Sequence, residues 1–329
     1  MAHNATILGG IAGTVLSPDE AAFFREADPW GFILFARNVE TPDQLRRLTG
    51  DLREAVGRDC IITVDQEGGR VQRLRAPHWT EWPAPLSQAA AGPRAMWLRY
   101  HLIGQELRAV GIDSNCAPTL DVARDATHPF LRDRCLGSDP ARIAELGRAA
   151  AEGLLAAGVL PVMKHMPGHG GAQIDSHHGL PEVAADLDAL DALDFAPFRA
   201  LADLPMGMTA HIRFAALDSA PATQSACVIG LIRDRIGFDG LLMTDDITMN
   251  ALPGTHAERA AASIAAGCDL VLHCNGDIAQ MAPVVAAAGA MSTSAMRRAD
   301  AALALRRDPK PADLPALHAE WRALTQAVA

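Results

Sequence analysis

The chain has 329 residues, and its 29 lysines and arginines against 39 aspartates and glutamates give a formal net charge of −10 at pH 7. Such a surface repels phosphate groups, which argues against nucleic acid and anionic membranes as partners. The chain has no apolar stretch of the roughly 20 residues that a membrane span needs, and its N-terminus lacks a basic segment typical of a secretory signal. These features, with six scattered cysteines that form no CxxC pair, predict a cytoplasmic protein.

Short apolar runs rich in β-branched residues recur along the chain, and most are followed by an alanine-rich helical pattern. The first two predicted helices begin at a capping residue followed by proline, at Ser17 and at Thr41, and a third covers residues 139–158. Eight strands are predicted, over residues 6–11, 31–36, 60–65, 112–117, 159–165, 206–211, 240–245 and 269–274.

Strands that alternate with helices are typical of a parallel sheet, and eight of them predict a single (β/α)8 barrel. We expect one catalytic domain over residues 1–329, with only helices from about residue 277, because no linker or repeat divides the chain. The alternative is an open doubly wound sheet. No GxGxxG or GxxxxGK[ST] motif follows a strand, which weakens its nucleotide-binding version.

Ionisable residues lie at the C-terminal ends of four predicted strands. In a barrel these ends meet at one mouth, where catalytic groups normally lie. A single aspartate at such a position is more often a helix cap, but four strands that deliver such groups to one face favour chemistry. The residues are Asp65, Lys164, His165, His211, Asp245 and Asp246.

The segment KHMPGHGGAQIDSHHGLP, residues 164–181 and called here the histidine loop, contains four histidines but too much glycine and proline for a helix. Three interpretations are open from the residues alone. A zinc site would draw its ligands from His165, His169, Asp175 and His177. A phosphate cradle would need a helix that begins at the end of the loop. In the third, Asp175 orients His177 and favours its protonated form, as a proton donor requires.

The histidine loop resembles the KHFPGHG…DSH…LP loop of family 3 glycoside hydrolases, specifically the bacterial cytoplasmic β-N-acetylglucosaminidases of peptidoglycan recycling. Further blocks of that family are matched in the same order by GFILFARN (31–38), VDQEGGRVQRL (64–74), APTLDV (117–122), RDRCLGSDP (132–140) and LIRDRIGFDGLLMTDDITM (231–249). The resemblance covers roughly residues 7–269 and implies a single barrel that carries its own acid/base loop.

By position, the resemblance implies Asp245 as the nucleophile and His177 with Asp175 as the acid/base pair. Neighbouring side chains on a strand point to opposite faces, so only Asp245, and not Asp246, is expected to face the barrel mouth. No metal and no cofactor are implied. The residues implied to hold the N-acetylglucosamine unit are Asp65, Arg73, Arg134, Lys164 and His165.

Three positions depart from the family pattern. Met166 stands where phenylalanine is usual and Ile247 where leucine is common, and these apolar exchanges should alter packing only slightly. His178 adds a second histidine beside His177, so that either imidazole could face Asp175.

The sequence therefore predicts a retaining exo-β-N-acetylglucosaminidase that acts on a small carbohydrate, an N-acetylglucosaminyl anhydro-muropeptide, through a covalent glycosyl-enzyme. A metal-dependent barrel hydrolase that uses the histidine loop is one alternative. A non-catalytic sugar-binding barrel is another, against which the complete set of Asp245, His177 and Asp175 argues.

The acid/base assignment predicts a dependence on the leaving group. His177→Ala should lose about 10²- to 10⁴-fold in kcat/KM on a natural disaccharide and much less on a 4-nitrophenyl glycoside, whose leaving group needs no proton. Asp175→Ala should show the same selectivity, and His178→Ala should be mild. The measurement is kcat/KM over leaving groups of graded pKa, and a steeper dependence in His178→Ala than in His177→Ala would move the proton to His178.

Overall fold

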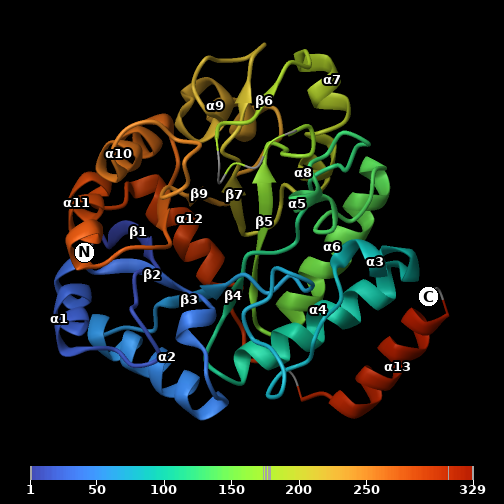
Figure 1. The fold of residues 1–329 in the computed structure, drawn as a ribbon, viewed down its shortest axis with the longest axis horizontal. Helices are drawn as coiled ribbons and strands as arrows, with labels where there is room; N and C mark the ends of the chain where they lie inside the picture. The colour runs from blue at the N-terminus through green and yellow to red at the C-terminus, as the bar shows by residue number, and fades with distance from the viewer. Residues whose placement is uncertain (1, 173, 175, 177–178, 310, 328–329) are drawn as a thin grey trace.

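The computed structural model describes residues 2–172, 174, 176, 179–309 and 311–327. Eight strands at the centre of the molecule form a closed barrel, each hydrogen-bonded in parallel to its neighbours, and helices surround them (Figure 1). This confirms the predicted (β/α)8 barrel and excludes the open sheet. In barrel order the strands are β1 (Asn4–Leu8), β2 (Pro29–Leu34), β3 (Ile61–Val64), β4 (Ser114–Asn115), β5 (Leu160–Met166), β7 (Met206–Thr209), β9 (Leu241–Asp246) and β10 (Leu270–His273).

All eight predicted strands are present, and the largest difference is in β4, where only two of six predicted residues pair as strand. Side chains add to main-chain hydrogen bonds there, such as the one from Asp113 N–H to the Ile62 carbonyl at 3.0 Å. The Asp113 carboxylate accepts the Ile62 N–H at 2.8 Å, and the Asn115 side chain accepts the Gln66 N–H at 3.0 Å. Polar side chains and the backbone thus share the hydrogen bonds of this short strand.

The helices begin where their caps predict. The Ser17 and Thr41 hydroxyls accept the N–H groups of Glu20 and Gln44, each at 3.2 Å. The larger helices are α1 (Pro18–Ala27), α2 (Pro42–Val56), α4 (Gly92–Arg108), α6 (Pro140–Ala156), α9 (Ala226–Asp234), α10 (His256–Ala266), α11 (Ile278–Ala288), α12 (Thr293–Leu303) and α13 (Leu314–Gln326). Shorter ones are α3 (Pro85–Gln88), α5 (Pro129–Arg132), α7 (Leu187–Ala192), α8 (Ala196–Ala200) and the 3₁₀ turns η1 (Ala36–Asn38), η2 (Ala89–Ala91) and η3 (Ala222–Gln224).

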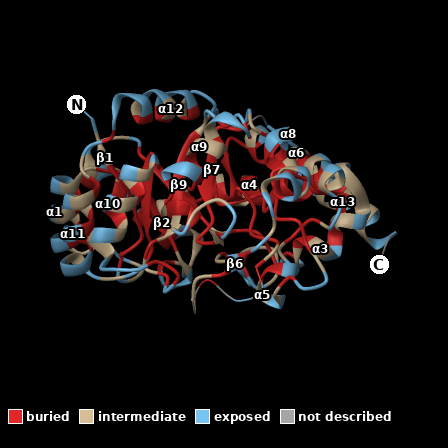
Figure 2. Ribbon diagram, turned by 90° about the horizontal axis from the view of Figure 1, so that it is seen from above, coloured by how far each residue is buried: buried red, intermediate tan, exposed pale blue. Residues whose placement is uncertain are grey.

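Helix α12 closes the N-terminal end of the barrel. Its buried alanines Ala295, Ala299 and Ala302 belong to the same apolar cluster as residues at the starts of the strands, such as Leu160 and Leu241. Seen from above, α12 lies at one edge of the molecule and the segments β6 and α5 lie at the opposite edge (Figure 2). The other end of the barrel is therefore free to hold a site.

A salt-bridge cluster adds to this closed end. The Asp113 carboxylate is fully buried, and its Oδ2 accepts from Arg53 at 3.0 Å and from Arg306, which follows α12, at 2.6 Å. The ion pairs tie the segment after α12 to the strands beneath it.

A small parallel sheet that the sequence did not predict lies outside the barrel. Strands β6 (Glu182–Val183) and β8 (Arg213–Phe214) pair, and the Arg213 N–H donates to the Pro181 carbonyl at 2.9 Å. With two residues each, they carry no periodic signal. They attach the end of the histidine loop to the segment after β7.

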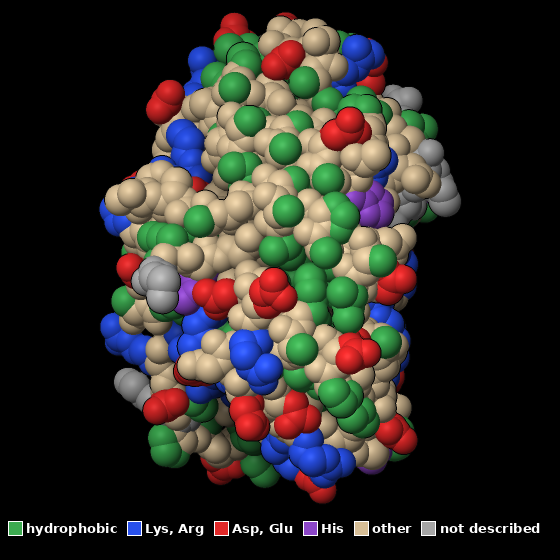
Figure 3. Space-filling model, turned by 90° about the vertical axis from the view of Figure 1, so that its left-hand side faces the viewer, with side chains coloured by type: hydrophobic (Ala, Val, Ile, Leu, Met, Phe, Trp, Pro, Cys, Tyr) green, Lys and Arg blue, Asp and Glu red, His purple; other side chains and the backbone are tan. Residues whose placement is uncertain are grey.

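The described part of the chain contains no helix both long and apolar enough to cross a bilayer. On the face shown in Figure 3, basic and acidic side chains are interspersed, and those that are described form no continuous basic patch there.

Helices α4 and α6 pack closely because glycines stand at their contact. A Cβ atom added at Gly153 would lie 2.4 Å from the Trp97 carbonyl oxygen, whereas one added at Gly230, on α9, would meet nothing within 4 Å. Gly153→Ala should therefore lower the free energy of unfolding by about 1–3 kcal/mol. Gly230→Ala should raise it by about 0.5–1 kcal/mol, through helix propensity alone. Urea denaturation measures both, and equal effects would contradict the packing argument.

Candidate active site

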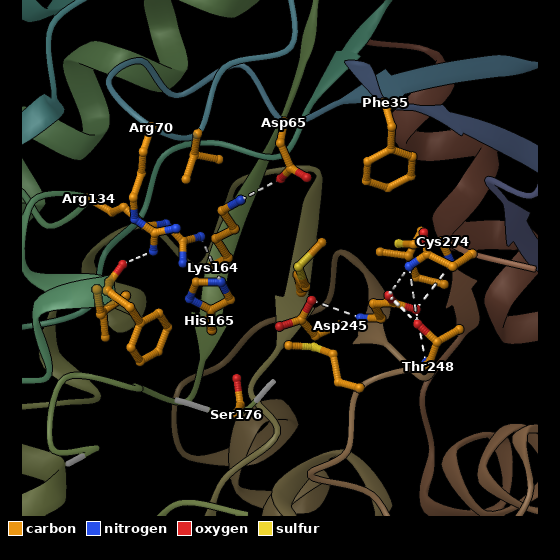
Figure 4. A pocket seen from close by; sticks show the side chains of 18 of the residues that line it. Phe35, Asp65, Arg70, Arg134, Lys164, His165, Ser176, Asp245, Thr248 and Cys274 are labelled. Atoms are coloured by element: carbon orange, nitrogen blue, oxygen red, sulfur yellow. Dashed lines mark hydrogen bonds and ion pairs between the residues drawn. The ribbon is translucent and has the colours of Figure 1, made fainter. Parts of the chain in front are cut away.

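A cavity of about 630 Å³ opens at the C-terminal end of the barrel strands, where barrel enzymes carry their active sites (Figure 4). The predicted nucleophile and all five predicted sugar-binding residues line it. Aromatic and thioether side chains, among them Phe35, Phe130, Met208 and Met249, form apolar parts of its wall. Its charged lining residues are Arg37, Asp65, Arg70, Arg73, Arg134, Lys164, Asp245 and Asp246.

Lys164, on β5, lies between two carboxylates at the base of the cavity. Its Nζ donates to Asp65 Oδ1 at 2.8 Å, and Glu67 Oε1 lies 2.6 Å away (Figure 4). Burial alone would lower the pKa of Lys164, but the two carboxylates outweigh it and raise the pKa above its ordinary value. Lys164 is thus a fixed cation.

Glu67 belongs to the same arrangement, but it is buried and does not line the cavity. Arg134 donates two hydrogen bonds to the Glu67 carboxylate, from Nε at 3.0 Å and from NH2 at 2.8 Å. Burial alone would raise the pKa of Glu67, but Arg134 and Lys164 outweigh it and lower the pKa to about 2. Asp65, Glu67, Arg134 and Lys164 are called the charged network below.

Asp65 faces the cavity from the end of β3. Its Oδ2 accepts from Arg73 NH2 at 3.1 Å, and Lys164 occupies its other oxygen. Burial alone would raise its pKa, but Lys164 and Arg73 outweigh it and hold the pKa well below its ordinary value. A carboxylate oxygen can accept more than one hydrogen bond, so Asp65 keeps lone pairs for the hydroxyl groups of a ligand.

His165 is oriented by a carboxylate that the cavity does not expose. Its Nδ1 lies 2.7 Å from Asp121 Oδ2, and its Nε2 lies 3.3 Å from NH2 of Arg134. Arginine can only donate, so a hydrogen bond to Nε2 places the ring proton on Nδ1, which donates to Asp121. The backbone N–H of His169 donates to the other Asp121 oxygen at 2.7 Å.

Asp245 and Asp246 both line the cavity, so the expectation that strand alternation turns Asp246 away is wrong. Alternation requires a regular ladder, and the pairing of β9 with β10 shifts register in this stretch. The two carboxylates differ in their hydrogen bonds. Asp246 accepts from Thr248 N and Oγ1 at 3.0 and 2.6 Å, from Cys274 N at 3.1 Å and from Asn275 Nδ2 at 3.3 Å.

Asp245, by contrast, accepts one hydrogen bond from the described residues, the backbone N–H of Asp246 at 2.8 Å (Figure 4). Burial alone would raise the pKa of Asp245, but the His165 and His211 imidazoles and this N–H outweigh it and lower the pKa below its ordinary value. The carboxylate is therefore ionised at neutral pH and less engaged than its neighbour, as a nucleophile requires.

The predicted acid/base residues Asp175 and His177, with His178, lie outside the described residues, so their roles stay predictions. The described parts of the histidine loop are held on both sides of them. The Thr127 hydroxyl donates to the Gly170 carbonyl at 2.6 Å, and the β6–β8 pairing holds the loop beyond Gly179.

The described residues hold no group of three or more His, Cys, Asp and Glu side chains placed to bind a metal ion. Both ring nitrogens of His165 already have partners in Asp121 and Arg134. The zinc interpretation would also need Asp175 and His177, which lie outside the described residues.

Glu67 and Asp121 are two residues of the site that were not predicted from the sequence. Glu67 lies within the motif VDQEGGRVQRL and Asp121 within APTLDV, and neither ends a predicted strand. A buried carboxylate in a motif that also supplies cavity residues is the signal that could have found them.

A parallel barrel whose mouth holds an ionised carboxylate among charged hydrogen-bonding groups fits the class of barrel enzymes that act on carbohydrates. Residues 20–304 match the model of the glycosyl hydrolase family 3 N-terminal domain, and the chain belongs to this family of glycoside hydrolases.

Relatives and solved structures agree with this. The chain is 40% identical over 281 residues to a beta-hexosaminidase of Alkalilimnicola ehrlichii, which covers 82% of this chain and 80% of that protein. It superimposes on a family 3 beta-N-acetylglucosaminidase from Paenibacillus sp. with a TM-score of 0.87 and 31% identity, over 99% of this chain and 67% of that one. NagZ from Neisseria gonorrhoeae in complex with N-trifluoroacetyl-D-glucosamine gives a TM-score of 0.83 and 29% identity, over 100% of this chain and 98% of that one.

The charged network predicts how stability depends on pH. The pKa of Glu67 is lower in the folded chain than in the unfolded one, so its contribution is complete above the ordinary value of about 4.3 and is lost as the pH falls toward 2. Glu67→Gln should cost about 3–5 kcal/mol near pH 7, because it leaves buried cations short of a partner. The difference in Tm between wild type and Glu67→Gln should shrink between pH 4.5 and 2.5.

The control is Glu320→Gln, which removes the solvent-exposed partner of Arg94 at 2.8 Å and should change Tm little. A Tm difference between wild type and Glu67→Gln that is constant over this pH range would contradict the assignment.

Proposed function

We propose that the chain is a retaining exo-β-N-acetylglucosaminidase that removes non-reducing terminal N-acetylglucosamine from peptidoglycan fragments, the anhydro-muropeptides, in the cytoplasm. The observation that carries the proposal is that the Asp245 carboxylate lines the same cavity as Asp65, Arg134 and Lys164 of the charged network. The carboxylate supplies a nucleophile, and the network supplies fixed donors and acceptors for sugar hydroxyl groups (Figure 4). We also propose that residues 1–329 act as one catalytic domain.

The choice of sugar is supported by the relatives. NagZ from Neisseria gonorrhoeae is described in complex with N-trifluoroacetyl-D-glucosamine, and the Paenibacillus structure is of a beta-N-acetylglucosaminidase. In this chain we assign the hydroxyl groups of the terminal sugar to Asp65, Arg73, Arg134, Lys164 and His165, which line one cavity.

In the first step, Asp245 attacks the anomeric carbon, and the bond to the leaving oxygen breaks as that oxygen takes a proton from His177. The product is a glycosyl ester of Asp245. In the second step, His177 removes a proton from water, the water oxygen bonds to the anomeric carbon, and Asp245 leaves as a carboxylate. Asp175 orients His177 and stabilises its charge. The charged network does not take part in bond making and holds the sugar in place.

The proposed nucleophile can be tested directly. The purified chain should hydrolyse 4-nitrophenyl N-acetyl-β-glucosaminide, and a fluorinated glycoside that slows the second step should label Asp245 in peptide maps. Asp245→Asn should lose activity by several orders of magnitude, because the covalent route is closed. Asp246→Asn is the matched control: it should keep the site of labelling and lose less.

Two outcomes would contradict the proposal. Label on Asp246 would reassign the nucleophile. Activity lost with EDTA and restored by zinc would favour the metal-dependent hydrolase instead.

A further inference from the structure

His211 follows β7 and was singled out by its position, but it does not line the cavity. Its side chain is fully buried and bridges two segments. Nε2 lies 2.9 Å from the backbone oxygen of Asp246, and Nδ1 lies 2.8 Å from the Thr223 hydroxyl. Nothing in the mechanism above uses this histidine.

The bridge continues the sheet where main-chain pairing stops. Strands β7 and β9 pair in register from Met206 with Leu241 to Met208 with Met243. At the same offset His211 stands level with Asp246, but the link between them is a side chain. His211 therefore links the end of β9 to the segment after β7, at the residue that follows Asp245.

The hydrogen bond to Asp246 assigns one proton of the ring. A carbonyl oxygen only accepts, so Nε2 carries the proton that is donated to Asp246. Burial lowers the pKa of His211, which favours the neutral ring, and Nδ1 lies 2.8 Å from the Thr223 hydroxyl. The Thr223 hydroxyl donates to the Ala210 carbonyl at 3.0 Å and lies 2.8 Å from the Thr209 hydroxyl, and these contacts hold it against the ring.

The backbone of Asp246 connects His211 to the proposed nucleophile. Its carbonyl accepts from His211, and its N–H donates to Asp245 Oδ1 at 2.8 Å. If the carbonyl were released, this residue could rotate and the carboxylate would lose the hydrogen bond that aims it.

We propose that His211 is a positioning residue that, through the Asp246 backbone, holds the Asp245 carboxylate in the geometry for attack. The inference rests on the proposed role of Asp245. Thr223 acts with it by holding the ring in place through Nδ1. A residue that only stabilised the fold would leave the state of the nucleophile unchanged, so the two roles can be separated by kinetics.

The acid limb of kcat/KM against pH provides one such readout, because it reports the ionisation of Asp245 in the free enzyme. The titratable or charged groups that act on Asp245 or are acted on by it come from several elements. They are Lys164 and His165 on β5, His169 after it, His211 after β7, Asp246 on β9, Cys116 after β4 and Cys274 after β10.

The experiment compares His211→Leu, which has no donor, with His211→Gln, whose amide N–H can reach the Asp246 carbonyl. With 4-nitrophenyl N-acetyl-β-glucosaminide, His211→Leu should lose about 10²-fold in kcat, the order that a misplaced reacting group costs. KM should change by less than about threefold, since the sugar-binding groups are untouched. The acid limb should move up by about 0.5–1 pH unit as Asp245 loses an N–H donor. His211→Gln should recover at least about tenfold of the loss.

The matched control is His101→Leu, which removes a buried histidine on α4, away from the cavity, and should leave kcat and the acid limb unchanged. If His211→Leu does not fold, the role of His211 is tested instead by kcat of Thr223→Val and of the double variant Thr223→Val with His211→Gln. Thr223→Val should lower kcat on its own and add little to His211→Gln, because its partner nitrogen is then absent.

Three results would overturn the inference: equal activity of His211→Leu and His211→Gln, a loss that falls on KM with an unmoved acid limb, or full additivity of Thr223→Val with His211→Gln. A wild-type chain without turnover, or with label away from Asp245, would instead count against the proposed function.

Discussion

Buried charge is the constraint on which the site depends. Lys164 and Glu67 are almost completely buried, and an ion removed from water costs several kcal/mol unless its partners replace the hydration. Here each charge has two partners of opposite sign: Lys164 touches Asp65 and Glu67, and Glu67 touches Lys164 and Arg134. The arrangement is stable only when all four side chains are in place, so they are fixed before any ligand arrives.

Fixed charges are useful at a sugar site. Hydroxyl groups are weak ligands compared with water, and binding them gains most where donors and acceptors need no reorganisation. The barrel supplies this by bringing β3 and β5 to the same mouth. Near its end β5 pairs irregularly with β7, between Met163 and Met166, and the consecutive residues Lys164 and His165 both face the cavity.

The fold followed from local patterns. Apolar β-branched runs and capping residues such as Ser17 depend on neighbours in the chain, so the eight strands and the helix starts were predictable. The mouth residues Asp65 and Lys164 could also be predicted from the sequence, because the C-terminal ends of parallel strands converge in a barrel. Glu67 and Asp121 were not, since their roles come from contacts with residues 97 and 44 positions away in the chain. The predicted orientation of Asp246 was wrong because the alternation of side chains requires regular pairing between strands. That regular pairing is lost at the strand ends.

The closed end of the barrel has a consequence for how such a protein can change. Helix α12 and the Asp113 cluster with Arg53 and Arg306 lie at the strand starts, and the cavity lies at the strand ends. Substitutions at the closed end alter the free energy of folding without touching the groups that meet a substrate. Adaptation to temperature and adaptation of specificity can therefore proceed on separate sets of residues, with little trade-off between them. Engineering for thermal stability should begin at the closed, N-terminal end of the barrel.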